Sequence, residues 1–141
     1  MSIRKGKVGE LKIIVELLER GFTVYTPIID VEGIDCIIKN SNGELIEIQC
    51  KYKKKGYFNQ FKMTGGARGN YFFIFYYADR KEYWVVPAEI IKEKAHYQES
   101  GKWANTYTID FSSNIQREKF KDYKESWIRL GKEAQKLQDA Q

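Results

Sequence analysis

The segment 34–52 constrains the fold of this chain more than any other part of the sequence. Two runs, 34–39 and 45–52, place apolar residues at alternate positions, and Asn40-Ser41-Asn42-Gly43 separates them. Asparagine and glycine are typical of tight hairpin turns because they tolerate a positive φ angle. The segment therefore predicts a β-hairpin, and with it a fold that contains at least one antiparallel pair of strands.

A three-residue loop that ends at Gly43 in the left-handed conformation fixes the register of this hairpin. Asn40 then pairs with Glu44, and Asp35 lies opposite Gln49. In this register one face is apolar: Ile34, Cys36, Ile38, Ile46, Ile48 and Cys50. The other face carries Asp35, Glu47, Gln49 and Lys51. A shift by one residue would mix the two faces, so the pattern supports the register.

Three side chains of different chemistry converge on the polar face. Asp35, Gln49 and Lys51 are expected to have Cβ atoms about 4.5 to 8 Å apart. A carboxylate and neutral carbonyl oxygens suit Mg²⁺, which prefers oxygen ligands and keeps several waters. An ammonium group beside them can stabilise a phosphate transition state or orient the attacking water. The pattern indicates phosphodiester hydrolysis, and its alternative is a polar sheet face that only contacts water.

A stretch without acidic residues follows the hairpin. No Asp or Glu occurs between Ile48 and Ala78, and the net charge of the chain is +5. A field of one sign next to the polar face favours contact with a polyanion such as DNA. The residues expected to contact phosphates or bases are Lys53, Lys54, Lys55, Tyr57, Asn59, Gln60, Lys62 and Arg68. The alternative is a basic loop that is only solvated.

The rest of the sequence alternates between helix and strand patterns. A helix is predicted at 7–20, with Leu11, Ile14, Val15 and Leu18 at helical spacing. Strands are predicted at 22–26, 71–78, 82–86 and 106–111, a short helix from Pro87, and a helix at about 114–138. With 141 residues the chain fits a single domain over 1–141. We predict an α/β fold with a central mixed β-sheet flanked by helices.

Composition excludes several classes of protein. One histidine and two cysteines cannot form a zinc cluster or a disulfide scaffold. Both cysteines lie on the apolar face of the hairpin, where we expect them to be core residues. No apolar run reaches the roughly 18 to 20 residues that span a bilayer. We therefore expect an intracellular, cytoplasmic protein without membrane contact.

On these residues the sequence resembles the PD-(D/E)XK nuclease superfamily. Its core is a helix followed by a sheet, with an aspartate on one strand and a (D/E)-x-K tripeptide on the next. Asp35 matches the aspartate, the tripeptide corresponds to Gln49 to Lys51, and Glu10 matches an acidic residue on the first helix. Ile34 replaces the proline of the motif, and Gln49 replaces its acidic residue. The Gln-x-Lys form is most similar to the small homing endonucleases of group I introns.

The resemblance implies a restriction-endonuclease-like fold and a metal-dependent, sequence-specific endonuclease that cuts double-stranded DNA. It implies Glu10, Asp35, Gln49 and Lys51 as catalytic residues. The first three would bind Mg²⁺, with Mn²⁺ as a substitute, although the helix macrodipole alone also explains Glu10. Cutting both strands requires two sites, so we expect a homo-oligomer, either a dimer or a tetramer. A Holliday-junction resolvase, a restriction-type nuclease and a DNA-binding module without turnover are the alternatives.

Overall fold

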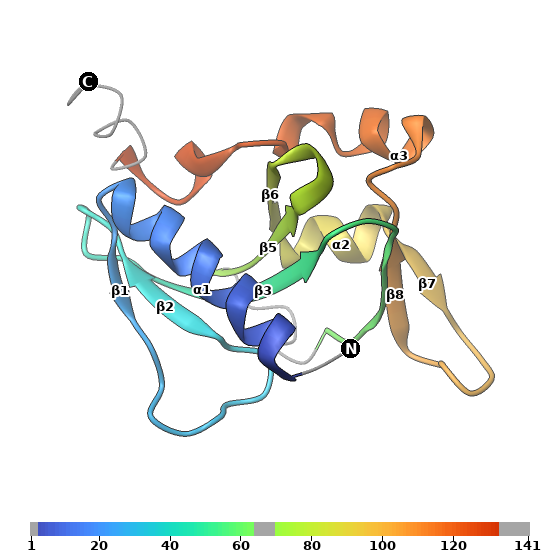
Figure 1. Ribbon diagram of the computed structural model, residues 1–141, viewed down its shortest axis with the longest axis horizontal. Coiled ribbons are helices and arrows are strands. Elements are labelled where there is room, and N and C mark those ends of the chain that lie inside the picture. The colour runs from blue at the N-terminus through green and yellow to red at the C-terminus, as the bar shows by residue number, and fades with distance from the viewer. Residues whose placement is uncertain (1–2, 64–69, 133–141) are drawn as a thin grey trace.

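A five-stranded mixed sheet forms the centre of the protein (Figure 1), in a computed structural model that describes residues 3–63 and 70–132. The strand order is β1-β2-β3-β5-β6. These strands are β1 (Thr23–Tyr25), β2 (Cys36–Lys39), β3 (Leu45–Lys53), β5 (Tyr71–Tyr77) and β6 (Glu82–Pro87). Only β3 and β5 run parallel, and the other neighbours are antiparallel. The predicted mixed sheet is confirmed.

The hairpin of β2 and β3 has the register that the sequence predicts. Cys36 pairs with Ile48 across the ladder. The backbone N–H of Asn40 donates to the carbonyl oxygen of Glu44 at 3.1 Å, and Gly43 has a φ of 81°. The second predicted hairpin is also present, since β5 and β6 pair through the short turn η1 (Ala78–Arg80). Local turn chemistry and alternation were sufficient to specify both hairpins.

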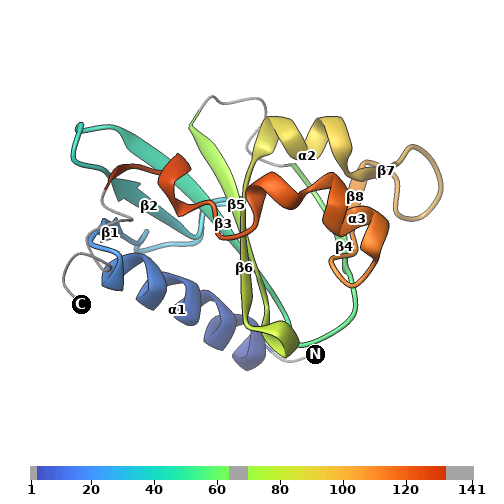
Figure 2. The same cartoon turned by 90° about the horizontal axis from the view of Figure 1, so that it is seen from above.

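Each face of the central sheet carries its own core. Helix α1 (Ile3–Glu19) covers one face, while α2 (Ala88–Lys94) and α3 (Asn114–Lys119) lie on the other side (Figure 2). Ile13, Ile14 and Leu17 of α1 pack on apolar residues of the β2–β3 hairpin and of the strands β5 and β6. The sheet is therefore covered by helices on both faces, as an α/β fold requires.

Helix α1, predicted at 7–20 and observed at Ile3–Glu19, packs through one of its two apolar flanks. Ile13, Ile14 and Leu17 are buried. Four apolar residues on the other flank are 44–53% exposed: Val8, Leu11, Val15 and Leu18. Of the apolar residues whose spacing predicted the helix, only Ile14 is buried, because both flanks meet the helical spacing and only contact with the sheet decides between them. No helix in the described ranges has the length and apolar character to cross a membrane.

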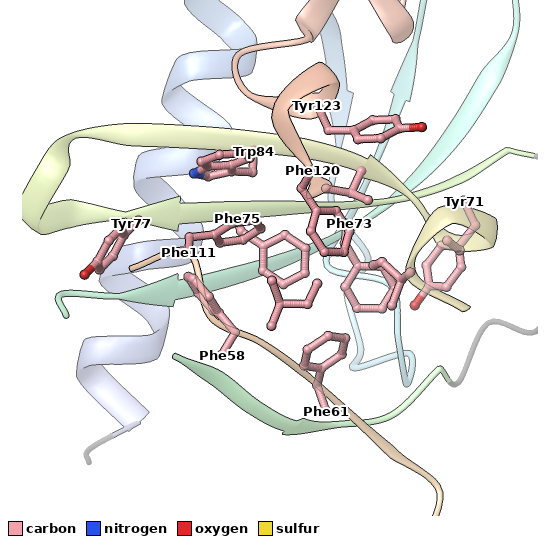
Figure 3. Packing of buried hydrophobic residues seen from close by; sticks show 14 residues of the cluster. Phe58, Phe61, Tyr71, Phe73, Phe75, Tyr77, Trp84, Phe111, Phe120 and Tyr123 are labelled. Carbon is pink, nitrogen blue, oxygen red and sulfur yellow. The ribbon is translucent and has the colours of Figure 1, made fainter. Parts of the chain in front are cut away.

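A second sheet, with strand order β4-β8-β7, covers the face opposite α1. Its strands are β4 (Phe58–Phe61), β7 (His96–Gln98) and β8 (Thr106–Ile109). Of these the sequence predicted only β8, with its end at 111 instead of 109. The layer between the two sheets is aromatic (Figure 3), and Trp84 stacks on Phe111 with ring centroids 4.2 Å apart. This packing holds β4 beneath β3 and β5.

The helix predicted at 114–138 is wrong from Phe120 to Lys132. Helix α3 ends at Lys119, and the chain continues in two short 3-10 turns, η2 (Lys121–Tyr123) and η3 (Trp127–Arg129). Glu125 between them has a φ of 53°, which no right-handed helix contains. Residues 133–138 of the prediction lie outside the described residues.

These turns allow the C-terminal segment to pass from one face of the sheet to the other. The apolar residues that suggested a helix are divided between the cores, with Phe120 and Tyr123 in the aromatic core and Trp127 and Leu130 in the core under α1. Between the two pairs, the N–H of Glu125 donates to the carbonyl oxygen of Tyr83 on β6 at 2.8 Å. A straight helix could not contact both faces, so packing overrides the periodicity.

Candidate active site

The ladder between β2 and β3 ends at Cys36, although β3 continues to Lys53. Asp35 leaves the ladder, and its N–H donates to the carbonyl oxygen of Ile48 at 2.8 Å. The Asp35 carboxylate accepts a hydrogen bond from the N–H of Cys50 at 2.7 Å. The cross-strand pair expected between Asp35 and Gln49 is replaced by this contact. A carboxylate therefore lies at the edge of β3 where the strand β2 stops.

Glu10 reaches Asp35 from helix α1. Burial raises the pKa of Asp35, and the charge and hydrogen bond of Glu10 raise it further. The N–H of Cys50 and the charge of Lys51 act in the opposite direction. Glu10 also accepts a hydrogen bond from the Lys7 ammonium at 2.9 Å. The two acidic residues that the sequence selected are thus brought together, at a place where a cation would relieve their repulsion.

Gly9 explains how α1 comes close enough to β3. A Cβ at position 9 would overlap with the Cβ and Cγ atoms of Tyr52 on β3. Gly6, one turn earlier, has no atom within 4 Å of an added Cβ. Of these two glycines, only the one before Glu10 lies against β3. A side chain at position 9 would force the helix away from the strand and carry Glu10 with it.

Gln49 and Lys51 project toward the aromatic layer on the other face of β3. The hydroxyl group of Tyr71 lies 2.7 Å from Oε1 of Gln49. The Lys51 ammonium lies 5.8 Å from the centroid of the Phe61 ring. Burial lowers the pKa of Lys51, whereas the nearby Asp35 carboxylate raises it. Tyr71 was predicted only as the first residue of the strand 71–78, because nothing local in the sequence connects it to Gln49.

A basic cleft lies between the start of α1 and the end of β3. Its volume is about 470 Å³. The lining comprises Arg4, Lys5, Val8, Tyr52, Lys53, Lys54 and Lys55. Three of these lysines were expected to contact DNA. Arg4 and Lys5 were missed because the helix was predicted to begin at 7, whereas it begins at Ile3.

The other residues expected to contact DNA are only partly described. Tyr57 is 51% exposed, and Lys62 is exposed just after β4. Asn59 and Gln60 belong to β4, but their side chains lie outside the described part of the structure, as does Arg68. The described members are thus accessible to a large ligand.

The donor atoms that meet at the end of β2 fit a hard divalent cation. They are the carboxylates of Glu10 and Asp35, and the nearby Gln49 amide belongs to the residue before Cys50, whose N–H binds the Asp35 carboxylate. Within 3–63 and 70–132 there is no cluster of three or more His, Cys, Asp or Glu residues. One or two carboxylates supplemented by a neutral oxygen and waters are what Mg²⁺ binds in phosphate-processing sites. The arrangement can therefore hold a metal ion beside an ammonium group.

Comparison with known proteins adds a family and two solved structures. The model of the PD-(D/E)XK endonuclease family matches residues 2–110. The structure of a bacterial homing endonuclease, I-Ssp6803I, is similar with a TM-score of 0.63 and 20% sequence identity, over 99% of this chain and 99% of that chain. The structure of Hjc from Archaeoglobus fulgidus, a Holliday junction resolvase, gives a TM-score of 0.55 and 19% identity, over 77% of this chain and 85% of that one. No curated protein matches the sequence.

Proposed function

The chain belongs to the PD-(D/E)XK endonuclease family, and on that premise we propose that it hydrolyses phosphodiester bonds of double-stranded DNA with the aid of Mg²⁺. One observation carries the proposal: Glu10 meets Asp35 where β2 stops and β3 continues, and the charge of Lys51 acts on the same carboxylate. Gln49, two residues before Lys51 on β3, is the further polar residue that we assign to the site. Nucleases of this family generally depend on a divalent metal ion, and the oxygen donors here suit one. Mn²⁺ is expected to substitute for Mg²⁺.

Each of these residues has a distinct role in the proposed reaction. The carboxylates of Asp35 and Glu10 and the carbonyl oxygen of Gln49 hold the metal ion. A metal ion held there supplies positive charge to the scissile phosphate and lowers the pKa of a bound water. Lys51 donates to the phosphate oxygens as negative charge develops on them, or orients the attacking water. The products carry 5′-phosphate and 3′-hydroxyl ends.

The basic cleft supplies the affinity for DNA in this proposal. Arg4, Lys5 and the lysines from Lys53 to Lys55 contact backbone phosphates, which makes binding depend on salt concentration. Side chains that follow the cleft along the chain would read bases: Tyr57, Asn59, Gln60, Lys62 and Arg68. Amide and basic side chains form specific hydrogen bonds with adenine and guanine in the major groove. We propose a sequence-specific enzyme of the homing-endonuclease type.

Two copies of the chain are needed to cut both strands of a duplex, because each copy has one site. We therefore propose a homo-oligomer, a dimer at least, with a tetramer as the larger alternative. The exposed flank of α1 outside the basic cleft, with Leu11, Val15 and Leu18, offers an apolar surface for such contacts. Sedimentation of the purified protein at micromolar concentration, with and without DNA, measures the number of copies.

The experiment that tests the function is a nicking assay on supercoiled plasmids with random inserts, in Mg²⁺ or in EDTA. Asp35→Asn and Lys51→Ala are expected to abolish cutting. Asp122→Asn on η2 and Lys39→Ala on β2 are matched controls, since both side chains are exposed and neither lines the cleft. The proposal fails if the two active-site variants cut as well as the controls do.

A junction resolvase is the second candidate, favoured by the structural similarity to Hjc. Parallel assays on a four-way junction and on linear duplex of the same sequence separate the two activities. Preference for the junction would replace the homing-type assignment. Binding of duplex DNA without cutting of any substrate would identify a DNA-binding module that keeps the nuclease fold.

A further inference from the structure

The hydroxyl group of Tyr71 lies between two oxygen atoms. One is the backbone carbonyl oxygen of Gly33 and the other is Oε1 of Gln49, each at 2.7 Å. Tyr71 is 1% exposed and stands at the end of the aromatic row on β5 (Figure 3). Its ring packs on Phe73 with centroids 5.4 Å apart, so the position of the hydroxyl group is fixed by packing.

A phenol has only one proton to donate. The carbonyl oxygen of Gly33 can only accept, so it must receive that proton if the 2.7 Å contact is to be a hydrogen bond. Two oxygens without a proton between them would repel each other at this distance. Gln49 then has to be the donor to the hydroxyl oxygen, and only its amide nitrogen can donate. The oxygen and nitrogen of a glutamine amide are assigned from such networks.

We infer that Tyr71 is a positioning residue, which together with Gly33 selects the orientation of the Gln49 amide. The nitrogen faces the phenol, and the carbonyl oxygen is left available to the metal ion. This inference rests on the proposed function of the site. A neutral amide binds a cation only through its oxygen, so one of its two orientations is useless there. A carboxylate has two equivalent oxygens and needs no selection.

The same hydroxyl group connects the two parts of the site. Gly33 precedes Asp35 by two residues and has a φ of 82°. Gln49 lies on β3, so the bridge through Tyr71 ties the loop before Asp35 to the strand that carries Gln49 and Lys51. Loss of the hydroxyl group would free the amide to turn over, without removing any residue that contacts the metal ion.

The test compares Mn²⁺ affinity, measured by calorimetry, in four proteins: wild type, Tyr71→Phe, Gln49→Glu and the double variant. Outer residues that orient a metal ligand change affinity by about 10-fold or more. In the protein that keeps Gln49, Tyr71→Phe is expected to weaken Mn²⁺ binding by about 10-fold. In the protein that carries Gln49→Glu, the same substitution is expected to weaken Mn²⁺ binding by less than about 2-fold. Tyr77→Phe, on the same strand and facing the same core, is the matched control and is expected to change nothing.

A second measurement requires no metal ion. In the wild type, NMR should show contacts between the Gln49 side-chain amide protons and the Tyr71 ring, and Tyr71→Phe should weaken them. Equal Mn²⁺ affinity of wild type and Tyr71→Phe would overturn the inference, as would an equal loss in both backgrounds, which marks a merely structural role. Failure of the wild type to bind Mn²⁺ or cut DNA would overturn the proposed function as well, so the two failures are distinguishable.

Discussion

Gly9 on α1 faces Tyr52 on β3 so closely that a Cβ atom at position 9 would overlap with the tyrosine side chain. Gly9→Ala is therefore expected to push α1 away from β3 and to separate Glu10 from Asp35. Overpacking of this kind costs about 1 to 3 kcal/mol of unfolding free energy. We expect a lower melting temperature and at least about a 10-fold loss of plasmid nicking, since small misplacements of catalytic groups reduce rates strongly.

Gly6→Ala is the control for this substitution, because nothing lies within 4 Å of the added Cβ. Alanine is favoured over glycine in a helix by about 1 kcal/mol, so this variant should be slightly more stable. Its nicking rate should equal that of the wild type. If both glycine variants behaved alike, close packing at Gly9 could not be the reason for its presence.

Glu82 forms the most buried ion pair described in the structure. It is 6% exposed and accepts hydrogen bonds from Arg117 at 2.6 and 2.7 Å, and Lys124 lies 3.0 Å away. Removal of one partner leaves a buried charge poorly compensated, so Arg117→Ala should cost about 3 kcal/mol in urea unfolding. Lys121→Ala, which breaks an exposed pair with Glu118, should cost about 0.5 kcal/mol or less.

The urea experiment also tests the organisation of the chain. We propose that residues 1–141 form one domain, because both cores include residues of the same two strands, β5 and β6. Fluorescence and circular dichroism should then report coincident transitions. Separate transitions would show that the two cores unfold independently.

The same ion pair predicts how stability depends on pH. Burial alone would raise the pKa of Glu82, but hydrogen bonds from Arg117 and Lys124 outweigh it and lower the pKa from 4.5 to about 2. Because the pKa of Glu82 is lowered, its ionised carboxylate contributes fully to the free energy of unfolding above pH 4.5. This contribution is lost as the pH falls toward 2. The difference in melting temperature between wild type and Glu82→Gln should shrink over that range. A constant difference would contradict the assignment.

The basic cleft predicts a change in the salt dependence of DNA binding. If Arg4 and Lys54 each contact a phosphate, replacing either by alanine should weaken binding and lower the slope of log K against log salt by about 0.9. Lys92→Ala on α2 is the control, since its exposed side chain lies on the opposite side of the sheet. Fluorescence anisotropy at several NaCl concentrations without divalent metal measures the slopes. Equal slopes for all three variants would exclude the cleft from the DNA interface.

The parts of the fold that the sequence predicted are those set by neighbouring residues. The turn that ends at Gly43 and the alternation around it specified the register of β2 and β3, and with it the proximity of Asp35 to Lys51. The restriction-endonuclease-like arrangement implied by the resemblance is confirmed. Local turn geometry and one-sided burial are enough to determine such features.

The parts that the sequence did not predict depend on distant contacts. The short strand β4 pairs with β8, which is far from it in the sequence. Contact with the sheet decides which apolar side of helix α1 is buried, because residues on both sides recur at helical spacing. In the bridge through Tyr71, Gly33 lies 38 positions from Tyr71 in the sequence, and Gln49 lies 22 positions from it. No periodicity within a single element reports contacts of this kind.

The C-terminal turns also determine how copies of this chain can meet. Backbone groups of β6 bind this segment, since Tyr83 accepts from the N–H of Glu125 at 2.8 Å and Val85 accepts from the hydroxyl of Ser126 at 2.9 Å. An uncovered outer strand is a template on which another molecule can add a strand, and repeated addition leads to aggregation. Because this border of the sheet is already occupied, growth of a continuous sheet from molecule to molecule is blocked at β6.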